Sequence, residues 1–250
     1  MRLILILTAL LAYQGAAASE LDDMKALADT GMAEAQYVLG WMYATGEGVP
    51  ENDAEAVKWY RKAADQGNAD AQYNLGSMYA NGEGVPENDA EAVKWYRKAA
   101  DQGLAEAQFN LGNMYERGAG VPENDAEAVK WYRKAADQGY AGAQLNLGFS
   151  YANGEGVPEN DAEAVKWFRK AADQGNAAAQ FNLGYMYATG EGVPENNIRA
   201  YVWWSMAKTQ GNTKAAGNLD ILKPQMTPQQ IADGQALATQ CYESGYKECD

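Results

Sequence analysis

Histidine is absent from this 250-residue sequence. The chain therefore has no histidine general base, no Ser–His or Cys–His nucleophile and no histidine ligand for zinc or haem. Basic residues are also scarce, with 20 Lys and Arg against 34 Asp and Glu and a net charge of −14. Because nucleic acids and anionic membranes bind basic surfaces, this charge argues against both as partners. Hydrophobic residues make up 47% of the chain, which is enough for a buried core.

One apolar stretch, near the start, has the pattern of a secretory signal peptide. Arg2 provides a positive charge, residues 3–12 are apolar but too few to span a bilayer, and Ala16 to Ala18 resemble a cleavage site. We expect cleavage after Ala18, removal of residues 1–18, and a secreted or periplasmic protein that is not inserted in the membrane. An uncleaved anchor is the alternative.

Cysteine occurs only twice, as Cys241 and Cys249. In an oxidising compartment the two are expected to form a disulfide, which contributes about 2.5 kcal/mol on the chain-entropy model. Two free thiols are the alternative. A catalytic thiol is less favoured, since no base accompanies either residue.

The same residues return every 36 positions through most of the chain. The glycines in this register are Gly31, Gly67, Gly103, Gly139, Gly175 and Gly211. The tryptophans are Trp59, Trp95, Trp131, Trp167 and Trp203. A fixed period of this length is typical of proteins built from stacked supersecondary units.

Each unit is predicted to form two helices. In the first unit, residues 33–45 have apolar side chains at helical spacing, and the glycine-rich sequence TGEGVP at 45–50 ends this helix. Asn52 or Asp53 is expected to cap the second helix, residues 54–66, and Asn52 with Glu55 resembles a capping box. Gly40, which recurs in every unit, is costly inside a helix, so we expect it to allow close approach of a neighbouring helix.

A single hairpin of this kind cannot fold alone. Ordering one residue costs roughly 1–2 kcal/mol, whereas burying one large side chain returns only about 1.5–3 kcal/mol. Stacking is therefore required, and we predict an all-α solenoid of about five 36-residue helix-turn-helix units. The expected divisions are a capping helix at 19–30, repeats at 31–66, 67–102, 103–138, 139–174 and 175–210, and a C-terminal cap at 211–250.

One set of residues defines the unit. In the first unit it consists of Ala35, Leu39-Gly40, Tyr43, Gly46, Gly48-Val49, Asp53, Ala56, Trp59-Tyr60, Lys62-Ala63-Ala64 and Gly67. This set resembles the pattern of the Sel1-like repeat family, a relative of the tetratricopeptide repeats. The fifth unit departs from it at Asn197, Trp204 and Met206. The resemblance implies a right-handed superhelical scaffold that binds other proteins, and exported bacterial members that act in envelope assembly or host-cell interaction.

Differences between the units are concentrated in the first helix. Residues 55–67 recur unchanged at 91–103 and 127–139, whereas the first helix varies along one face. We call its central position the variable row, which consists of Trp41, Ser77, Asn113, Phe149 and Tyr185. Residues four positions before and after share this face. A face that varies while the core repeats is expected to meet solvent or a ligand.

Beside it lies an asparagine row, which consists of Asn74, Asn110, Asn146 and Asn182. The stripe resembles the concave surface through which tetratricopeptide repeats bind peptides, so we predict that both rows contact a partner. The asparagines would hydrogen-bond an extended backbone; alternatively, they satisfy polar groups between helices. The bulky series four residues before the variable row is expected to belong to the core: Tyr37, Tyr73, Phe109, Leu145 and Phe181. Lysine is missing from the stripe, which gives no support for a bound C-terminal carboxylate.

Two motifs resemble a catalytic site and a metal site, and we interpret both as structural. Ser205 and Lys208 match the S-x-x-K of penicillin-recognising serine enzymes, but the K-T-G and S-D-N motifs are missing. The acidic loops, such as residues 46–53, do not match a calcium-binding loop, and their carboxylates complement helix N-termini. We therefore predict no catalytic residue, no metal site and no cofactor.

The sequence thus predicts a non-enzymatic scaffold or adaptor. It would bind a protein or peptide in a concave groove lined by the first helices, in the bacterial envelope or at the host interface. One alternative is a secreted adhesin or invasion factor that contacts host cells. The other is a hydrolase that acts on β-lactams or cell-wall material.

Overall fold

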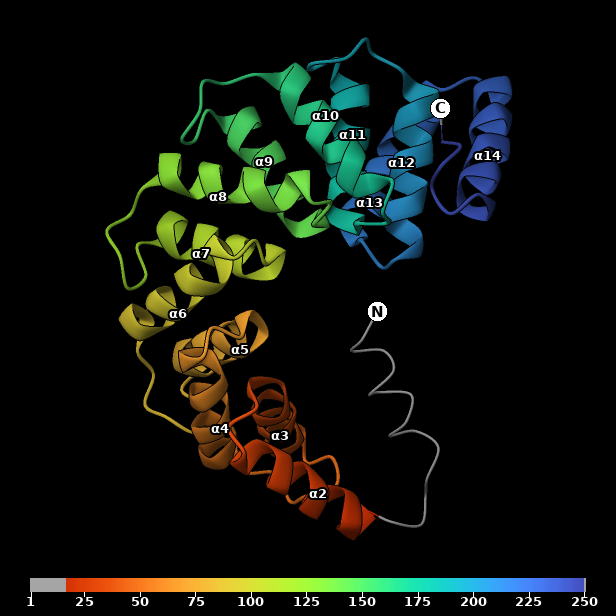
Figure 1. The fold of residues 1–250 in the computed structure, drawn as a ribbon. Coiled ribbons are helices and arrows are strands. Elements are labelled where there is room, and N and C mark those ends of the chain that lie inside the picture. Colours follow the sequence, from red (N-terminus) through yellow and green to blue (C-terminus); the bar gives the residue numbers. More distant parts are fainter. Residues whose placement is uncertain (1–16, 250) are drawn as a thin grey trace. The chain divides into compact units, whose positions relative to one another are not determined.

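Pairs of helices in tandem make up the structure, a computed structural model that describes residues 17–249. Residues 1–16 of the predicted signal peptide lie outside the described residues. Within residues 17–249 the structure has helices and no strand, which confirms the predicted all-α solenoid of helix pairs (Figure 1). The elements are α2 (Ala17–Asp29), α3 (Ala33–Thr45), α4 (Asp53–Asp65), α5 (Ala69–Asn81), α6 (Asp89–Asp101), α7 (Ala105–Arg117), α8 (Asp125–Asp137), α9 (Ala141–Asn153), α10 (Asp161–Ala172), α11 (Ala177–Thr189), α12 (Asn197–Thr209), α13 (Thr213–Leu222), the 3₁₀ turn η1 (Lys223–Gln225) and α14 (Pro228–Glu243).

We call α3, α5, α7, α9 and α11 the A helices, and α4, α6, α8, α10 and α12 the B helices. The chain divides into two compact units. The first contains α2 to α6, and the second contains most of α7 together with α8 to α14. In the first compact unit α2 packs on α3, α3 on α4, α4 on α5 and α5 on α6; in the second, α8 to α13 pack each on the next, and α14 packs on α12.

The mid-helix glycine of each A helix receives an aromatic ring from the B helix that follows. A Cβ atom at Gly112 would lie only 2.5 Å from Cε1 of Tyr132, and one at Gly148 would lie 2.6 Å from Cδ1 of Phe168. The same contact joins Gly40 to Tyr60, Gly76 to Tyr96 and Gly184 to Trp204. This confirms that these glycines allow close approach of a neighbouring helix.

Buried glutamines link one repeat to the next. Gln72 of α5 donates through Nε2 to the carbonyl of Ala64 in α4 (3.0 Å), and its Oε1 accepts from Gln102 (2.8 Å). Gln144 makes the corresponding bonds to Ala136 and Gln174 in the second unit. Gln72 and Gln144 are each only 4% exposed, so satisfying both ends of the amide avoids the cost of an unpaired buried polar group.

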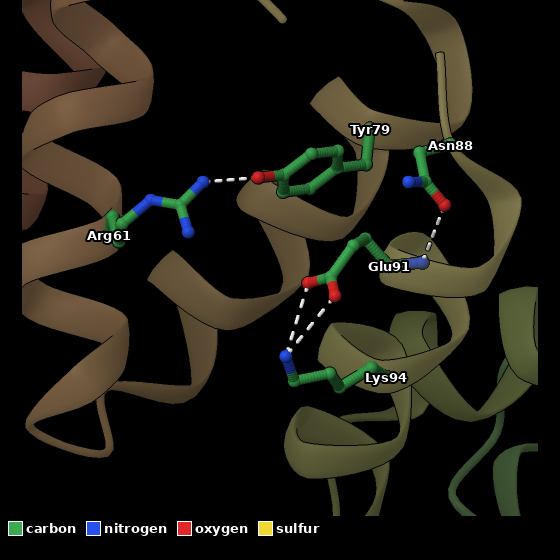
Figure 2. Close-up of polar contacts among 5 residues, drawn as sticks. All are labelled: Arg61, Tyr79, Asn88, Glu91 and Lys94. Carbon is green, nitrogen blue, oxygen red and sulfur yellow. Dashed lines mark hydrogen bonds and ion pairs between the residues drawn. The ribbon is translucent and has the colours of Figure 1, made fainter. Parts of the chain in front are cut away.

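Two further contacts repeat along the chain. The Arg61 guanidinium of α4 donates to the Tyr79 hydroxyl of α5 (Figure 2). Arg133 bonds Tyr151 and Arg169 bonds Tyr187 in the same way. Each of these bonds joins a B helix to the A helix of the following repeat.

The capping box expected at the start of the B helices is only half formed. The Asn88 side chain accepts a hydrogen bond from the backbone N–H of Glu91 (3.1 Å), as a cap should. The Glu91 carboxylate, however, pairs with Lys94 one turn later (Figure 2). A lysine three positions along the helix offers the carboxylate a charged partner.

The predicted disulfide between Cys241 and Cys249 is present at the end of α14. The loop that it closes is held by further bonds, in which Tyr246 N donates to Cys241 O (2.8 Å) and Glu248 N donates to Ser244 Oγ (3.0 Å). The Tyr246 ring packs on Gly175, where an added Cβ would lie 2.8 Å from Cε2. The closed loop therefore packs on the turn between α10 and α11.

The glycine contact predicts the effect of Gly148→Ala. Alanine is the better helix former, yet its Cβ would collide with the buried Phe168 ring, so we expect a loss of about 1–3 kcal/mol. Gly217→Ala is the matched control, because Gly217 lies in α13 with nothing within 4 Å of an added Cβ. The control should gain up to about 1 kcal/mol. Urea unfolding midpoints measure both, and equal midpoints would contradict the contact.

The disulfide predicts a local loss of stability on reduction. The double variant Cys241→Ser/Cys249→Ser should lose about 2.5 kcal/mol from α14, because the open loop gains chain entropy. Hydrogen exchange of α14 amides measures this loss. Amides of α3 should be unaffected, and equal acceleration at both ends would show that the bridge does not act locally.

Candidate functional site

The variable row lies along the A helices, and each member follows directly after the glycine that receives the B-helix ring. Its members meet different surroundings in the two compact units of the chain. In the first compact unit, Trp41 is half-buried and packs against two clusters of core residues. Ser77 is half-buried, and its Oγ accepts a hydrogen bond from the Tyr96 hydroxyl (3.1 Å). These two residues are therefore partly engaged within the fold.

Asn113 is the centre of a polar cluster in the second unit. Its Oδ1 accepts from the Tyr132 hydroxyl (2.7 Å) and from Asn146 Nδ2 (3.2 Å). Burial raises the pKa of the Tyr132 hydroxyl above its ordinary value, with the negative charge of Glu116 acting in the same direction. Tyr132 is therefore held as a neutral donor, and it fixes the orientation of Asn113.

The last two members of the row are exposed aromatic residues. Phe149 is 37% exposed and Tyr185 is 44% exposed. Phe149 packs edge-on against Phe168 with ring centroids 5.2 Å apart. The Tyr96 and Tyr132 hydroxyls bond the polar members Ser77 and Asn113, and Phe168 lies against the apolar Phe149. In the first repeat the ring is Tyr60, and the adjacent residue is the apolar Trp41.

A sixth member of this row, Ile221, was not predicted from the sequence. It lies 36 residues after Tyr185, near the end of α13, and is 67% exposed. The period itself would have identified it, but α13 has lost most other residues of the repeat. We call Phe149, Tyr185 and Ile221 the apolar strip.

The neighbouring rows contribute to packing. Rings of the series expected in the core are half-buried, with Tyr37 packed against Tyr60 and Phe109 against Tyr132, both at 5.9 Å between centroids. In the asparagine row, Asn74, Asn110, Asn146 and Asn182 are all half-buried. Asn182 Nδ2 donates to the Ala178 carbonyl (2.8 Å). A contact of either row with a partner stays a prediction.

Other candidate sites lie away from the variable row. Ser205 is half-buried and Lys208 is exposed, both on α12. Among the residues that the structure describes, no cluster of three Asp, Glu, Cys or His side chains could hold a metal ion. An open cleft of about 550 Å³ lies along α8, lined by residues that include Trp131, Lys134 and Val157. It contains no residue of the variable row.

The chain matches known proteins along most of its length. The family model described as the Sel1 repeat matches residues 33–68, 69–104, 105–140, 141–176 and 177–212. A crystal structure of c5321, a protective antigen of uropathogenic Escherichia coli strains with an SLR fold, is 43% identical with a TM-score of 0.78. The match covers 80% of this chain but only 43% of that protein, so this chain spans less than half of its length.

A second crystal structure, of a Sel1 repeat protein from Oxalobacter formigenes, is 36% identical with a TM-score of 0.73. The match covers 83% of this chain and 85% of that one. No match was found among curated proteins.

The polar cluster around Asn113 predicts a pH effect on stability. Because the folded-state pKa of Tyr132 lies above its unfolded value of about 10, its contribution is complete below pH 10 and is lost as the pH rises further. Tyr132→Phe should cost about 0.5–1.5 kcal/mol at neutral pH and should flatten the fall in stability above pH 10. Urea unfolding at pH 7 to 11 tests this, and Phe168 shows that phenylalanine fits the position. An unchanged alkaline slope in the variant would contradict the assignment.

Proposed function

The chain belongs to the Sel1 repeat family, and we propose that it is a non-enzymatic adaptor that binds another protein or a peptide through the variable row of its A helices. Proteins of this family generally mediate protein–protein interaction and are generally non-enzymatic. The observation that supports the A-helix face is the exposure of Phe149 and Tyr185 at corresponding positions of two successive repeats. Side chains of this size on a folded surface are typical of binding sites.

We further propose that the protein is exported. The signal-peptide pattern of residues 1–18 supports export, as does the Cys241–Cys249 bridge, which suits an oxidising compartment. No helix within the described residues has the length and apolar character needed to cross a bilayer. The repeat divisions proposed from the sequence, at 31–66 and every 36 residues to 210, each contain one A helix and one B helix.

A role at the host interface, as an adhesin or invasion factor, is the second candidate. It is favoured by the 43% identity to a protective antigen of uropathogenic Escherichia coli strains. Accessibility of the protein to added protease on intact cells separates the two locations: digestion supports the host interface, and protection supports a role inside the envelope.

Site-specific crosslinking tests the binding face. A photoreactive residue at Tyr185 should give a discrete crosslinked product in cells that produce the protein, because this side chain is exposed on an A helix. The matched control is Lys166 on the B helix α10, whose side chain is 65% exposed. It should give no such product. Equal yields of the same product from both positions would place the partner elsewhere.

A further inference from the structure

The last B helix of the chain has a further helix packed on it. Like α10, which packs on α9 and α11, α12 packs on the A-type helices before and after it, but it also packs on α14 (Figure 1). At this contact a Cβ added to Gly234 of α14 would lie 2.8 Å from Cδ1 of Tyr201. The buried residues of α14 are Gly234, Ala238 and Cys241, all of them small. A helix with small residues along one side therefore fits closely against a B helix.

The face of α12 that faces this helix is apolar, whereas the same face of α8 is charged. Val202 and Met206 of α12 are buried, and because α14 is the additional neighbour of α12, we attribute this burial to α14. The equivalent residues of α8, 72 positions earlier, are Lys130 and Lys134, which are exposed and line the cleft along α8. The cleft therefore lies where a helix packs on α12, with lysines in place of apolar residues.

The tryptophan that lines this cleft has an unpaired indole N–H group. Within residues 17–249, no acceptor bonds Nε1 of Trp131, although this residue is only 8% exposed. Three of its equivalents, Trp95, Trp167 and Trp203, also lack an acceptor, but their Nε1 atoms are enclosed by protein. The Nε1 atom of Trp131 is accessible by comparison. It is therefore a donor that a bound group can reach, and this feature distinguishes the cleft along α8 from the other B helices that carry an enclosed indole.

A cation lies beside this donor. Within the described residues Lys134 has no ion pair, and its Nζ lies 3.7 Å from the centroid of the Trp131 ring. Of the two carboxylates that line the cleft, Glu127 pairs with Lys130, and Asp137 lies at the end of α8. A carboxylate on a bound molecule can therefore accept from the indole N–H and pair with the Lys134 ammonium. Such charge-assisted bonds are stronger than bonds between neutral groups.

We propose that the cleft along α8 binds a helix of a partner protein that carries small residues along one side and a carboxylate beside them. The small residues allow the close approach that α14 makes to α12. The carboxylate pairs with Lys134 and accepts from the indole N–H of Trp131. This is a second interaction surface, formed by a B helix, and it is independent of the A-helix face in the proposed function.

Nuclear magnetic resonance of the indole N–H groups tests the proposal at Trp131 itself. This resolution is needed because α4 and α6 have the same sequence as α8. The chain has seven tryptophans, and the signal that is lost in Trp131→Phe identifies the one in the cleft. The probes are two stapled helical peptides with Ala or Gly at the spacing of Gly234, Ala238 and Cys241, which differ only in a central Glu or Gln beside these residues.

The Glu peptide should shift the Trp131 signal of the full-length protein and leave those of Trp95 and Trp167 in place. It should also bind roughly tenfold more tightly than the Gln peptide, because the ionised acceptor strengthens the bond. Equal affinity for the two peptides, no shift at Trp131, or a larger shift at either of the other two signals would overturn the proposal.

Exchange of charge locates the contact. Lys134→Glu should weaken binding of the Glu peptide at least tenfold and should bind a third peptide, with a central Lys, in its place. Lys170→Glu is the matched control, because Lys170 lies over Trp167 in the same way on α10, where the indole N–H is enclosed. Circular dichroism checks that both variants are folded. Binding that survives Lys134→Glu, or that is lost in Lys170→Glu, would show that the cleft is not the site.

Discussion

In every repeat, the two helices are held together where an aromatic ring occupies the space of a missing side chain. The ring of Tyr132 lies against the backbone of Gly112, and Phe168 lies against Gly148. A larger residue at either glycine would push the B helix away and open the core, because protein interiors are close-packed. The ring also reaches past the glycine to the next residue of the A helix. The contact that builds the core therefore sets the surroundings of the variable row.

This coupling accounts for part of the variation along the row. The Tyr96 and Tyr132 hydroxyls bond the polar row members Ser77 and Asn113, whereas the Tyr60 hydroxyl bonds Asn74 and leaves Trp41 apolar. Phe168 has no hydroxyl, and its neighbour Phe149 is apolar and exposed. One substitution in an otherwise unchanged B helix thus accompanies the change from a polar surface to an apolar one.

The helices could be predicted from the sequence because their signals are local. The repeated glycines, prolines and asparagines mark where helices begin and end, and α3 has the predicted bounds of 33–45. The capping box was expected in full, but only its asparagine half forms, because the Glu91 carboxylate pairs with Lys94 instead of returning to Asn88, and that competition between side chains is not visible in the motif. The uneven burial of Trp41 and Tyr185 depends on neighbouring repeats, which a single-helix pattern does not contain. Ile221 was missed because α13 no longer resembles a full repeat.

Repetition limits the positions at which one repeat can differ from another. The glutamine links and the ring contacts must recur in each repeat, since Gln72 and Gln144 would otherwise leave buried amides unpaired. The glycine and the glutamine are the same in each repeat, and the ring position is always aromatic, as Tyr132, Phe168 and Trp204 show. The position after the glycine is freer, because it touches the core on one side and solvent on the other. Functional differences between parts of the chain must therefore depend mainly on such positions. Phe149, Tyr185 and Ile221 differ most from the polar members of the variable row.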